Sequence, residues 1–235
     1  MKSPTYNRTM TPERSRCLEV LAELVLQLRR PHPIRVAIDG PDAAGKTILA
    51  DELAPLLERS GRPVIRASID DFHRPQAERL ARGAESPEGY FHDSFDYPAL
   101  RAALLDPLGP GGDRQYRRRV FDFGADEPVA APVEVAPSNA VLVFDGVFLQ
   151  RDELIDLWDF SAFVSAPFAE TQRRAAVRDA VLFGSEDKTL HRYRVRYVPG
   201  QQLYFGQVHP LEKADVVIDN EDPDRPQLRL GGRRA

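Results

Sequence analysis

The sequence has a single cysteine, Cys17, and only four lysines among its 32 basic residues. One cysteine excludes an internal disulfide and a zinc site built from cysteines. No apolar run reaches the roughly 18 residues that a membrane span needs, and the first residues lack the apolar core of a signal peptide. These absences predict a cytoplasmic protein that does not enter a membrane.

The overall charge of the chain does not point to a nucleic-acid partner. A net charge of −4 and a pI near 5.8 give no bulk reason to expect nucleic-acid binding. With 235 residues, 42% of them hydrophobic, the chain can bury a sizeable core. We expect a single domain over residues 1–235, and the sequence leaves homo-oligomer formation open.

Short apolar runs alternate with helical patterns along most of the chain. A helix is expected at 12–30, inside an N-terminal segment 1–33, and another at 45–59. The expected strands are 34–39, 62–70, 140–145, 160–165 and 214–219. Such alternation predicts an α/β fold, a three-layer sandwich with a five-stranded parallel sheet and helices on both faces.

Two regions break this rhythm. The core is expected to comprise residues 34–73 and 139–221, separated by a long insertion at 74–138 that is rich in Gly, Pro and charge. Within the insertion, "YRRRVFDF" (116–123) and "PVEV" (132–135) can pair as a hairpin. A long insertion in a compact fold usually carries function or is disordered. Residues 222–235 are expected to form a tail.

The stretch "GPDAAGKT" (40–47) matches the phosphate-binding pattern G-x-x-x-x-G-K-[ST], between an expected strand and an expected helix. Gly40 and Gly45 let backbone amides turn towards phosphate oxygens, and the helix that follows directs its positive end at the same anion. Lys46 can reach the β- and γ-phosphates of ATP, and Thr47 can bind Mg²⁺. The predicted nucleotide-binding residues are Gly40, Asp42, Ala43, Ala44, Gly45, Lys46, Thr47 and Ile48.

Two further motifs help to distinguish nucleotide switches, ATPases and small-molecule kinases. No N-K-x-D motif of a guanine-specific switch is present. In "VLVFDG" (141–146), Asp145 can hold Mg²⁺ together with Thr47, but Gly146 cannot activate water as the glutamate of many ATPases does. A small-molecule kinase remains, and it needs a base, an acceptor pocket and a lid that excludes water.

Candidates for the base and the lid follow the expected strands. "SIDDFHR" (68–74) places Asp70 and Asp71 at the carboxyl end of the second strand, where ligands bind in parallel α/β folds. In an extended chain only one of the two can face the phosphate. In the helical pattern 168–179, Arg174 and Arg178 share one face, which suits a lid at about 171–197, although a solvated charged helix has the same pattern.

Taken in order, these motifs resemble the uridine kinase, phosphoribulokinase and pantothenate kinase group of P-loop kinases, and uridine kinases above all. The motifs are "GPDAAGKT", "SIDDFHR", "SFDYPAL" (94–100), "VFDGVF" (143–148), "RRAAVRD" (173–179), "YRVRYVPG" (193–200) and "ADVVIDN" (214–220). The resemblance implies a P-loop NTPase fold and a kinase that transfers the γ-phosphate of ATP to a hydroxyl group, with uridine or cytidine as the leading acceptor.

The resemblance also implies residue roles. Asp70 falls on the family's general base, and Asp71 on a variable position. Asp145 stands where uridine kinases usually have Glu, so its Mg²⁺ role is implied with a shorter side chain. Lys46, Arg174 and Arg178 match residues that act on the phosphates. Asp96 is placed near the sugar hydroxyls of a nucleoside.

Departures from the family pattern concern the acceptor. Phe121 and, approximately, Asp126 replace a tyrosine and a histidine that grip the pyrimidine, Tyr97 replaces a histidine, and His73 replaces the usual tyrosine after Phe72. The candidate acceptor residues are Asp70, Phe72, His73, Asp96, Tyr97, Arg119 and Phe121. Arg117, Arg118 and Arg119 suit either an acidic acceptor or a solvated basic hairpin. A kinase of pantothenate, a sugar, glycerate or another small alcohol, and a regulatory nucleotide-binding protein, remain alternatives.

Overall fold

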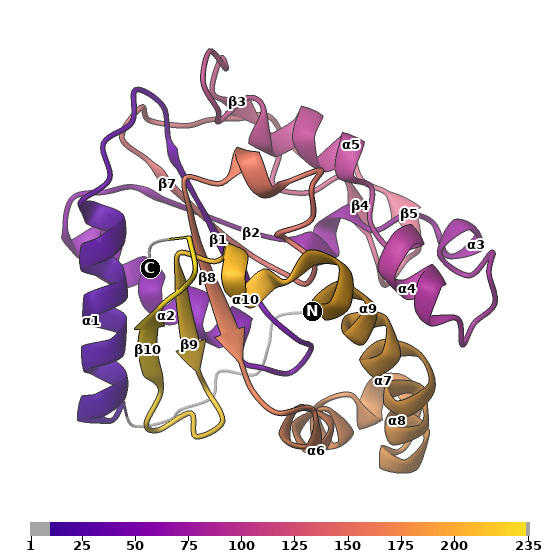
Figure 1. Cartoon of the computed structure of the whole chain (residues 1–235). Helices are drawn as coiled ribbons and strands as arrows, with labels where there is room; N and C mark the ends of the chain where they lie inside the picture. The colour runs from indigo at the N-terminus through magenta and orange to yellow at the C-terminus, as the bar shows by residue number, and fades with distance from the viewer. Residues whose placement is uncertain (1–9, 234–235) are drawn as a thin grey trace.

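The computed structural model describes residues 10–233, so residues 1–9 of the expected N-terminal segment and residues 234–235 of the expected tail lie outside it. Its centre is a sheet in the order β10-β9-β8-β1-β7-β2, with helices on both faces (Figure 1). The parallel strands are β1 (Ile34–Asp39), β2 (Val64–Ser68), β7 (Val141–Asp145), β8 (Phe160–Ser165) and β9 (Val216–Asp219). The predicted α/β class with five parallel strands is confirmed.

A sixth strand lies at the edge of the sheet. β10 (Gln227–Leu230) runs antiparallel to β9, with Gln227 opposite Asp219. The expectation of a tail was therefore wrong for these residues. A four-residue strand at a sheet edge, with three of its side chains exposed and only Leu228 packed on the core, is too short and too polar to give a periodic apolar signal.

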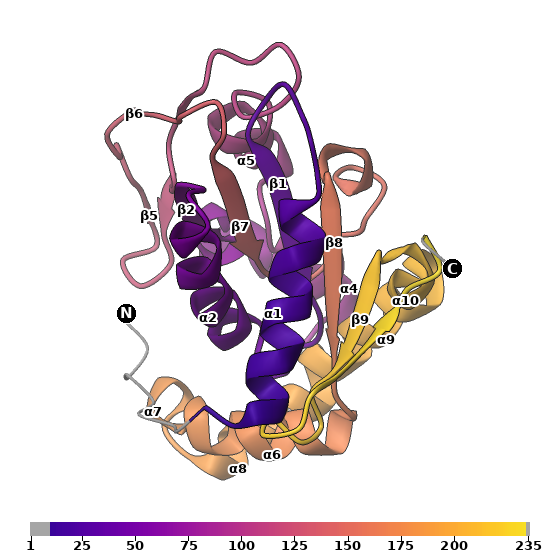
Figure 2. The ribbon, with the colours of Figure 1, turned by 90° about the vertical axis from the view of Figure 1, so that its left-hand side faces the viewer.

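Each face of the sheet has its own core. Val36 and Ile38 of β1 pack under α1 (Pro12–Leu26) and α2 (Lys46–Arg59), which cover the face seen in Figure 2. Ala37, between them, packs on the opposite face with the aromatic side chains of α4 (Pro87–Asp93). This alternation is what a strand covered on both sides requires. Helix α1 ends four residues before the predicted position, where Arg29 donates to the carbonyl oxygen of Leu26.

The insertion follows η1 (Ile69–Phe72) and forms several short elements. They are α3 (Gln76–Arg79), α4, α5 (Tyr97–Leu100), η2 (Arg101–Leu105), β3 (Gln115–Tyr116), β4 (Phe121–Asp122), β5 (Glu127–Pro128) and β6 (Glu134–Val135). β3 pairs with β6, and β4 pairs with β5. The expected pairing of 116–123 with 132–135 is thus present only between β3 and β6, because the chain between them folds back on itself.

After β8 the chain forms a set of helices that begins at the carboxyl end of the sheet and runs back to the start of β9 (Figures 1 and 2). These are α6 (Phe168–Arg178), α7 (Ala180–Phe183), α8 (Glu186–Arg192), η4 (Tyr193–Tyr197), α9 (Val198–Val208) and α10 (Pro210–Lys213), with η3 (Ile155–Leu157) preceding β8. The segment 171–197, expected as a lid, lies in this set. Among residues 10–233, no helix is both long and apolar enough to cross a bilayer.

Candidate active site

The phosphate loop connects β1 to α2 with a tightly constrained backbone. Gly40 has a φ of +145°, and a Cβ there would lie 2.2 Å from the carbonyl oxygen of Val164 on β8. Gly45, at φ +100°, precedes the first residue of α2, and Ala43 also has a positive φ of 58°. These conformations turn the loop back over the start of α2, where backbone amides and the helix end favour an anion.

Lys46 lies inside this loop. The side chain is buried, and Nζ donates a 2.7 Å hydrogen bond to the carbonyl oxygen of Pro41 in the same loop. Burial lowers the pKa of Lys46, while the nearby carboxylates of Asp42 and Asp39 oppose that shift. The ammonium group is therefore held where the phosphates of a nucleotide would bind.

Behind the loop, Asp39 is fully buried at the end of β1. Its carboxylate accepts hydrogen bonds from the amide of Gly40 (2.7 Å), the hydroxyl of Tyr204 and the side-chain amide of Gln150 (3.3 Å). Burial raises the pKa of Asp39, and these three donors oppose the shift. Asp39 thus ties the first residue of the phosphate loop to α9.

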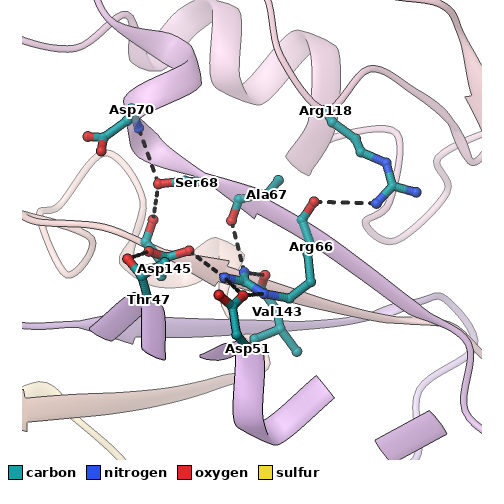
Figure 3. Close-up of polar contacts among 9 residues, drawn as sticks. All are labelled: Thr47, Asp51, Arg66, Ala67, Ser68, Asp70, Arg118, Val143 and Asp145. Atoms are coloured by element: carbon teal, nitrogen blue, oxygen red, sulfur yellow. Dashed lines mark hydrogen bonds and ion pairs between the residues drawn. The ribbon is translucent and has the colours of Figure 1, made fainter. Parts of the chain in front are cut away.

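Thr47 and Asp145 form the expected metal-binding pair. Thr47 Oγ1 donates to Asp145 Oδ2 at 2.6 Å, and Ser68 Oγ donates to the main-chain oxygen of Asp145 at 3.2 Å (Figure 3). A hydroxyl and a carboxylate beside a phosphate loop are the few protein oxygens that Mg²⁺ uses when phosphates and water complete its shell. Within residues 10–233 no group of three or more His, Cys, Asp or Glu could hold a metal by itself. The donor set therefore fits a nucleotide-bound Mg²⁺.

The loop after β2 differs from the sequence prediction. β2 ends at Ser68, whose Oγ accepts from the amide of Asp70 at 3.4 Å, and Ile69–Phe72 form a 3₁₀ turn. Strand alternation therefore does not separate Asp70 from Asp71, because the chain is not extended there. Ser68, the last residue of β2, caps the turn, and this turn contains both carboxylates.

The two aspartates still have different surroundings. The Asp70 side chain is open to solvent, yet the protein around it removes enough water to raise its pKa, and the acids Asp145 and Asp42 add to this rise. Ser68 joins Asp70 to Asp145, because its Oγ accepts from the amide of Asp70 and donates to the main-chain oxygen of Asp145 (Figure 3). Asp71 instead faces Arg119, whose Nε lies 3.8 Å from Asp71 Oδ1.

The two expected lid arginines make different contacts. Arg174 donates to the carbonyl oxygens of Asn220 (3.0 Å) and Glu221 (2.8 Å), so it holds α6 to the end of β9. Arg178 pairs with Asp179, and it is close enough to Lys46 to lower the pKa of that lysine. The positive charge of Arg178 thus acts on Lys46 of the phosphate loop.

The expected lid segment packs directly on the phosphate loop. Ala43 of the loop forms a small apolar cluster with Ala175 of α6 and Tyr193 of η4. These contacts bring the helix that carries both arginines against the loop. The phosphate site is therefore covered on one side by residues of the predicted lid.

On the acceptor side, His73 packs against two aromatic rings at tilted angles. Its ring centre lies 4.6 Å from that of Phe95 and 4.5 Å from that of Phe123, and the guanidinium of Arg79 lies over the Phe123 ring. His73 Nδ1 lies 2.9 Å from the carbonyl oxygen of Asp70. Burial lowers the pKa of His73, and a neutral ring must then carry its proton on Nδ1 to donate to that oxygen.

The other acceptor candidates are either buried or paired with a nearby residue. Phe72, Tyr97 and Phe121 are buried, with exposed fractions of 0%, 7% and 4%. Asp96 caps α5 by accepting from the amide of Ala99 at 2.9 Å. Arg119 pairs with Asp122 at 2.9 Å, in addition to its contact with Asp71. Their burial and local pairing leave His73 and Asp70 as the candidates that the structure brings together.

The basic hairpin residues also have local partners. Arg118 makes a two-pronged contact with Glu134, and Arg117 donates to the carbonyl oxygen of Ala131. Asp126, at the position approximating a family histidine, accepts from Arg79. These contacts favour the interpretation of a solvated basic hairpin.

Sequence reasoning missed Arg66 on β2 and Gln201 on α9. Arg66 donates to Asp145 Oδ1 at 2.9 Å, and Gln201 donates to Asp42 Oδ2 at 3.0 Å. Arg66 is a charged residue in the middle of an expected strand, and this position could have indicated that it has a buried partner. Gln201 lies in a helix whose pattern gave no comparable signal.

No family model matches the chain. It is 24% identical over 200 residues to a Schizosaccharomyces pombe protein named "Putative uridine kinase", covering 77% of this chain and 82% of that one. It is 26% identical over 190 residues to uridine-cytidine kinase B of Dictyostelium discoideum, covering 80% and 74%. Among solved structures, a "possible uridine kinase" from Bacillus stearothermophilus has a TM-score of 0.69 at 22% identity, covering 86% of this chain and 97% of that one.

The structural match supports the fold, and the two sequence matches cover 77% and 80% of the chain. The chain is a distant homologue of the uridine and uridine-cytidine kinases and has the fold of a P-loop kinase.

Proposed function

We propose that this protein is a kinase that transfers the γ-phosphate of ATP to a hydroxyl group of a small molecule. The observation that carries the proposal is that Asp70 lies in the turn directly after β2, where Ser68 bonds both the amide of Asp70 and the main-chain oxygen of Asp145, the partner of Thr47. A carboxylate there can accept the proton of an acceptor, and no glutamate follows Asp145 to activate water.

In the proposed reaction the acceptor oxygen attacks the γ-phosphorus, and its proton passes to Asp70. The bond between the γ-phosphorus and the β,γ-bridging oxygen breaks, and ADP leaves with that oxygen. Lys46 and Arg178 offset the negative charge on the phosphate oxygens, and Arg174 keeps α6 in place. Mg²⁺ held by Thr47 and Asp145 would supply further neutralisation of the β- and γ-phosphates. Most of the rate enhancement then comes from positioning and electrostatics.

The acceptor that we propose first is a nucleoside of the uridine or cytidine type. Support comes from the names of the two relatives, both of which are uridine or uridine-cytidine kinases. The second candidate is a small alcohol without a base, such as a sugar, pantothenate or glycerate. Burial of Tyr97 and Phe121 favours this candidate, because those positions are expected to hold a pyrimidine in a uridine kinase.

One assay separates these possibilities. Purified protein is mixed with ATP and Mg²⁺ and with each of a panel of nucleosides, sugars, pantothenate and glycerate, and ADP release is followed. Release with uridine or cytidine supports the first acceptor, and release with another alcohol supports the second. ATP binding without release across the panel would contradict the kinase proposal and favour a regulatory nucleotide-binding protein.

A further inference from the structure

Arg66 of β2 occupies the centre of a polar network beside the predicted metal pair (Figure 3). Its Nε and one terminal nitrogen donate to Asp51 Oδ1 of α2, at 3.0 and 2.9 Å. The same terminal nitrogen donates to Asp145 Oδ1 at 2.9 Å. The other terminal nitrogen donates to the carbonyl oxygens of Val143 (2.6 Å) and Ala67 (3.3 Å). The guanidinium therefore has protein partners in several directions.

The two carboxylates that Arg66 joins have unequal exposure. The Asp145 side chain is 3% exposed, whereas that of Asp51 is 60% exposed. A buried carboxylate needs a cation or several donors, so Arg66 compensates for the desolvation of Asp145. Asp51 in turn balances the charge of Arg66. The three groups together carry one net negative charge, which leaves Asp145 attractive to a metal ion.

The two carboxylate oxygens of Asp145 accept hydrogen bonds from different residues. Oδ1 is held by Arg66, and Oδ2 accepts from Thr47, the other predicted metal ligand. β2 and β7 pair in parallel, and Arg66 lies opposite Val143, two residues before Asp145. The contact with the carbonyl oxygen of Val143 therefore fixes the guanidinium to the strand that carries Asp145.

We propose that Arg66 is a positioning residue for Asp145: it holds Oδ1, so that Oδ2 and Thr47 Oγ1 face the nucleotide site together as metal-binding oxygens. The proposal deepens the proposed function and rests on its metal site, but not on the identity of the acceptor. Lysine should not replace Arg66, because a single ammonium group cannot hold Asp145, Asp51 and the two carbonyl oxygens at once.

Mn²⁺ binding provides a test that needs no turnover. Electron paramagnetic resonance measures free Mn²⁺ in the presence of saturating non-hydrolysable ATP analogue and no acceptor. We expect Arg66→Lys and Arg66→Gln each to raise the Mn²⁺ dissociation constant by about 10- to 100-fold, the usual effect of losing a group that orients a metal ligand. Arg118→Gln is the matched control. Arg118 reaches Arg66 only at its main-chain oxygen, and no hydrogen bond joins Arg118 to Asp145.

The outcomes are distinguishable. Wild-type Mn²⁺ affinity in both Arg66 variants would overturn the proposal, and so would wild-type affinity in Arg66→Lys alone, since charge would then suffice. Tighter binding in Arg66→Gln would show that the guanidinium opposes the metal, which also overturns it. If the wild-type protein itself shows no nucleotide-dependent Mn²⁺ binding, the result contradicts the metal site of the proposed function, on which the role of Arg66 rests. Thermal unfolding and analogue binding measured without metal confirm that each variant is folded.

Discussion

Gln201 and Asp42 hold each other through two hydrogen bonds. The amide of Asp42 donates to Gln201 Oε1 at 3.1 Å, and Gln201 Nε2 donates to Asp42 Oδ2 at 3.0 Å. Tyr90 of α4 donates to the same Asp42 oxygen at 2.6 Å. One residue of the phosphate loop is therefore held both by α9, which follows the lid, and by a helix of the acceptor-side insertion.

Gln201→Leu should weaken ATP binding by about 30-fold, because two hydrogen bonds that preset the loop are worth roughly 1 kcal/mol each. Isothermal titration with a non-hydrolysable ATP analogue measures this change. Gln202→Leu, on the exposed neighbour in the same helix, is the control and should bind normally. Equal affinity in both variants would show that the loop does not depend on α9.

Asp70→Asn should lower kcat by about 10²- to 10⁴-fold and leave ATP binding intact, because an amide keeps the shape of the side chain and cannot take a proton. Steady-state kinetics with the responsive acceptor, together with ATP titration, gives both quantities. Asp71→Asn should have a much smaller effect, since Asp71 faces Arg119. A full rate in the Asp70 variant would remove this residue from the mechanism.

The rate should depend on pH through Asp70. Only the ionised carboxylate can accept a proton, and its pKa is raised above the usual 3.8 by desolvation and by neighbouring acids. As the pH falls through this raised value Asp70 becomes protonated, so kcat should fall on an acid limb that lies above pH 3.8. Because Asp42 contributes to the rise, Asp42→Asn should move the limb to lower pH. A limb at the same position in both proteins would contradict this assignment.

Arg178→Met should lower kcat by about 10²- to 10³-fold, the usual cost of removing one group that stabilises transition-state charge. Arg174→Met should act mainly on stability, because Arg174 is bound to the carbonyl oxygens of Asn220 and Glu221. Stopped-assay kinetics and thermal unfolding of both variants test the difference. The reverse pattern would exchange the two roles.

Gly40→Ala should destabilise the protein by several kcal/mol and abolish nucleotide binding, since its Cβ would lie 2.2 Å from the carbonyl oxygen of Val164. Gly206→Ala in α9 is the control, because a Cβ there meets no atom within 4 Å. That substitution should stabilise the helix by about 0.5–1 kcal/mol. Chemical denaturation of both variants measures the changes.

Sequence motifs of contiguous residues were enough to predict the parts of the candidate site that they form. The phosphate loop and the strand ending in Asp145 were predictable, because glycines and apolar runs determine local structure by themselves. The turn at Asp70 was not, since a hydrogen bond from its amide to Ser68 ends the strand two residues before the apolar pattern does. Contacts such as that of Gln201 with Asp42 join distant parts of the chain, and no local pattern encodes them.

The acceptor residues show a further limit. Tyr97 and Phe121 were expected at the acceptor because of their positions in motifs, and the structure buries them. An aromatic side chain contributes equally well to a pocket or to a core, so its place in a motif does not determine its exposure. His73 is also aromatic, but its polar ring bonds to the main chain of Asp70 and stays at the site.

The central position of β1 has a consequence for biosynthesis. Ile34 lies opposite Val141, and Asp39 lies opposite Phe163, so both neighbours of the strand leave the ribosome long after it does. Gly40 also packs against Val164. Pairing over such separations is slow, and in a nascent chain β1 stays unpaired until β7 is made and keeps one open edge until β8 follows. Because Gly40 packs on Val164, the phosphate loop can take its final shape only after β8 has been made.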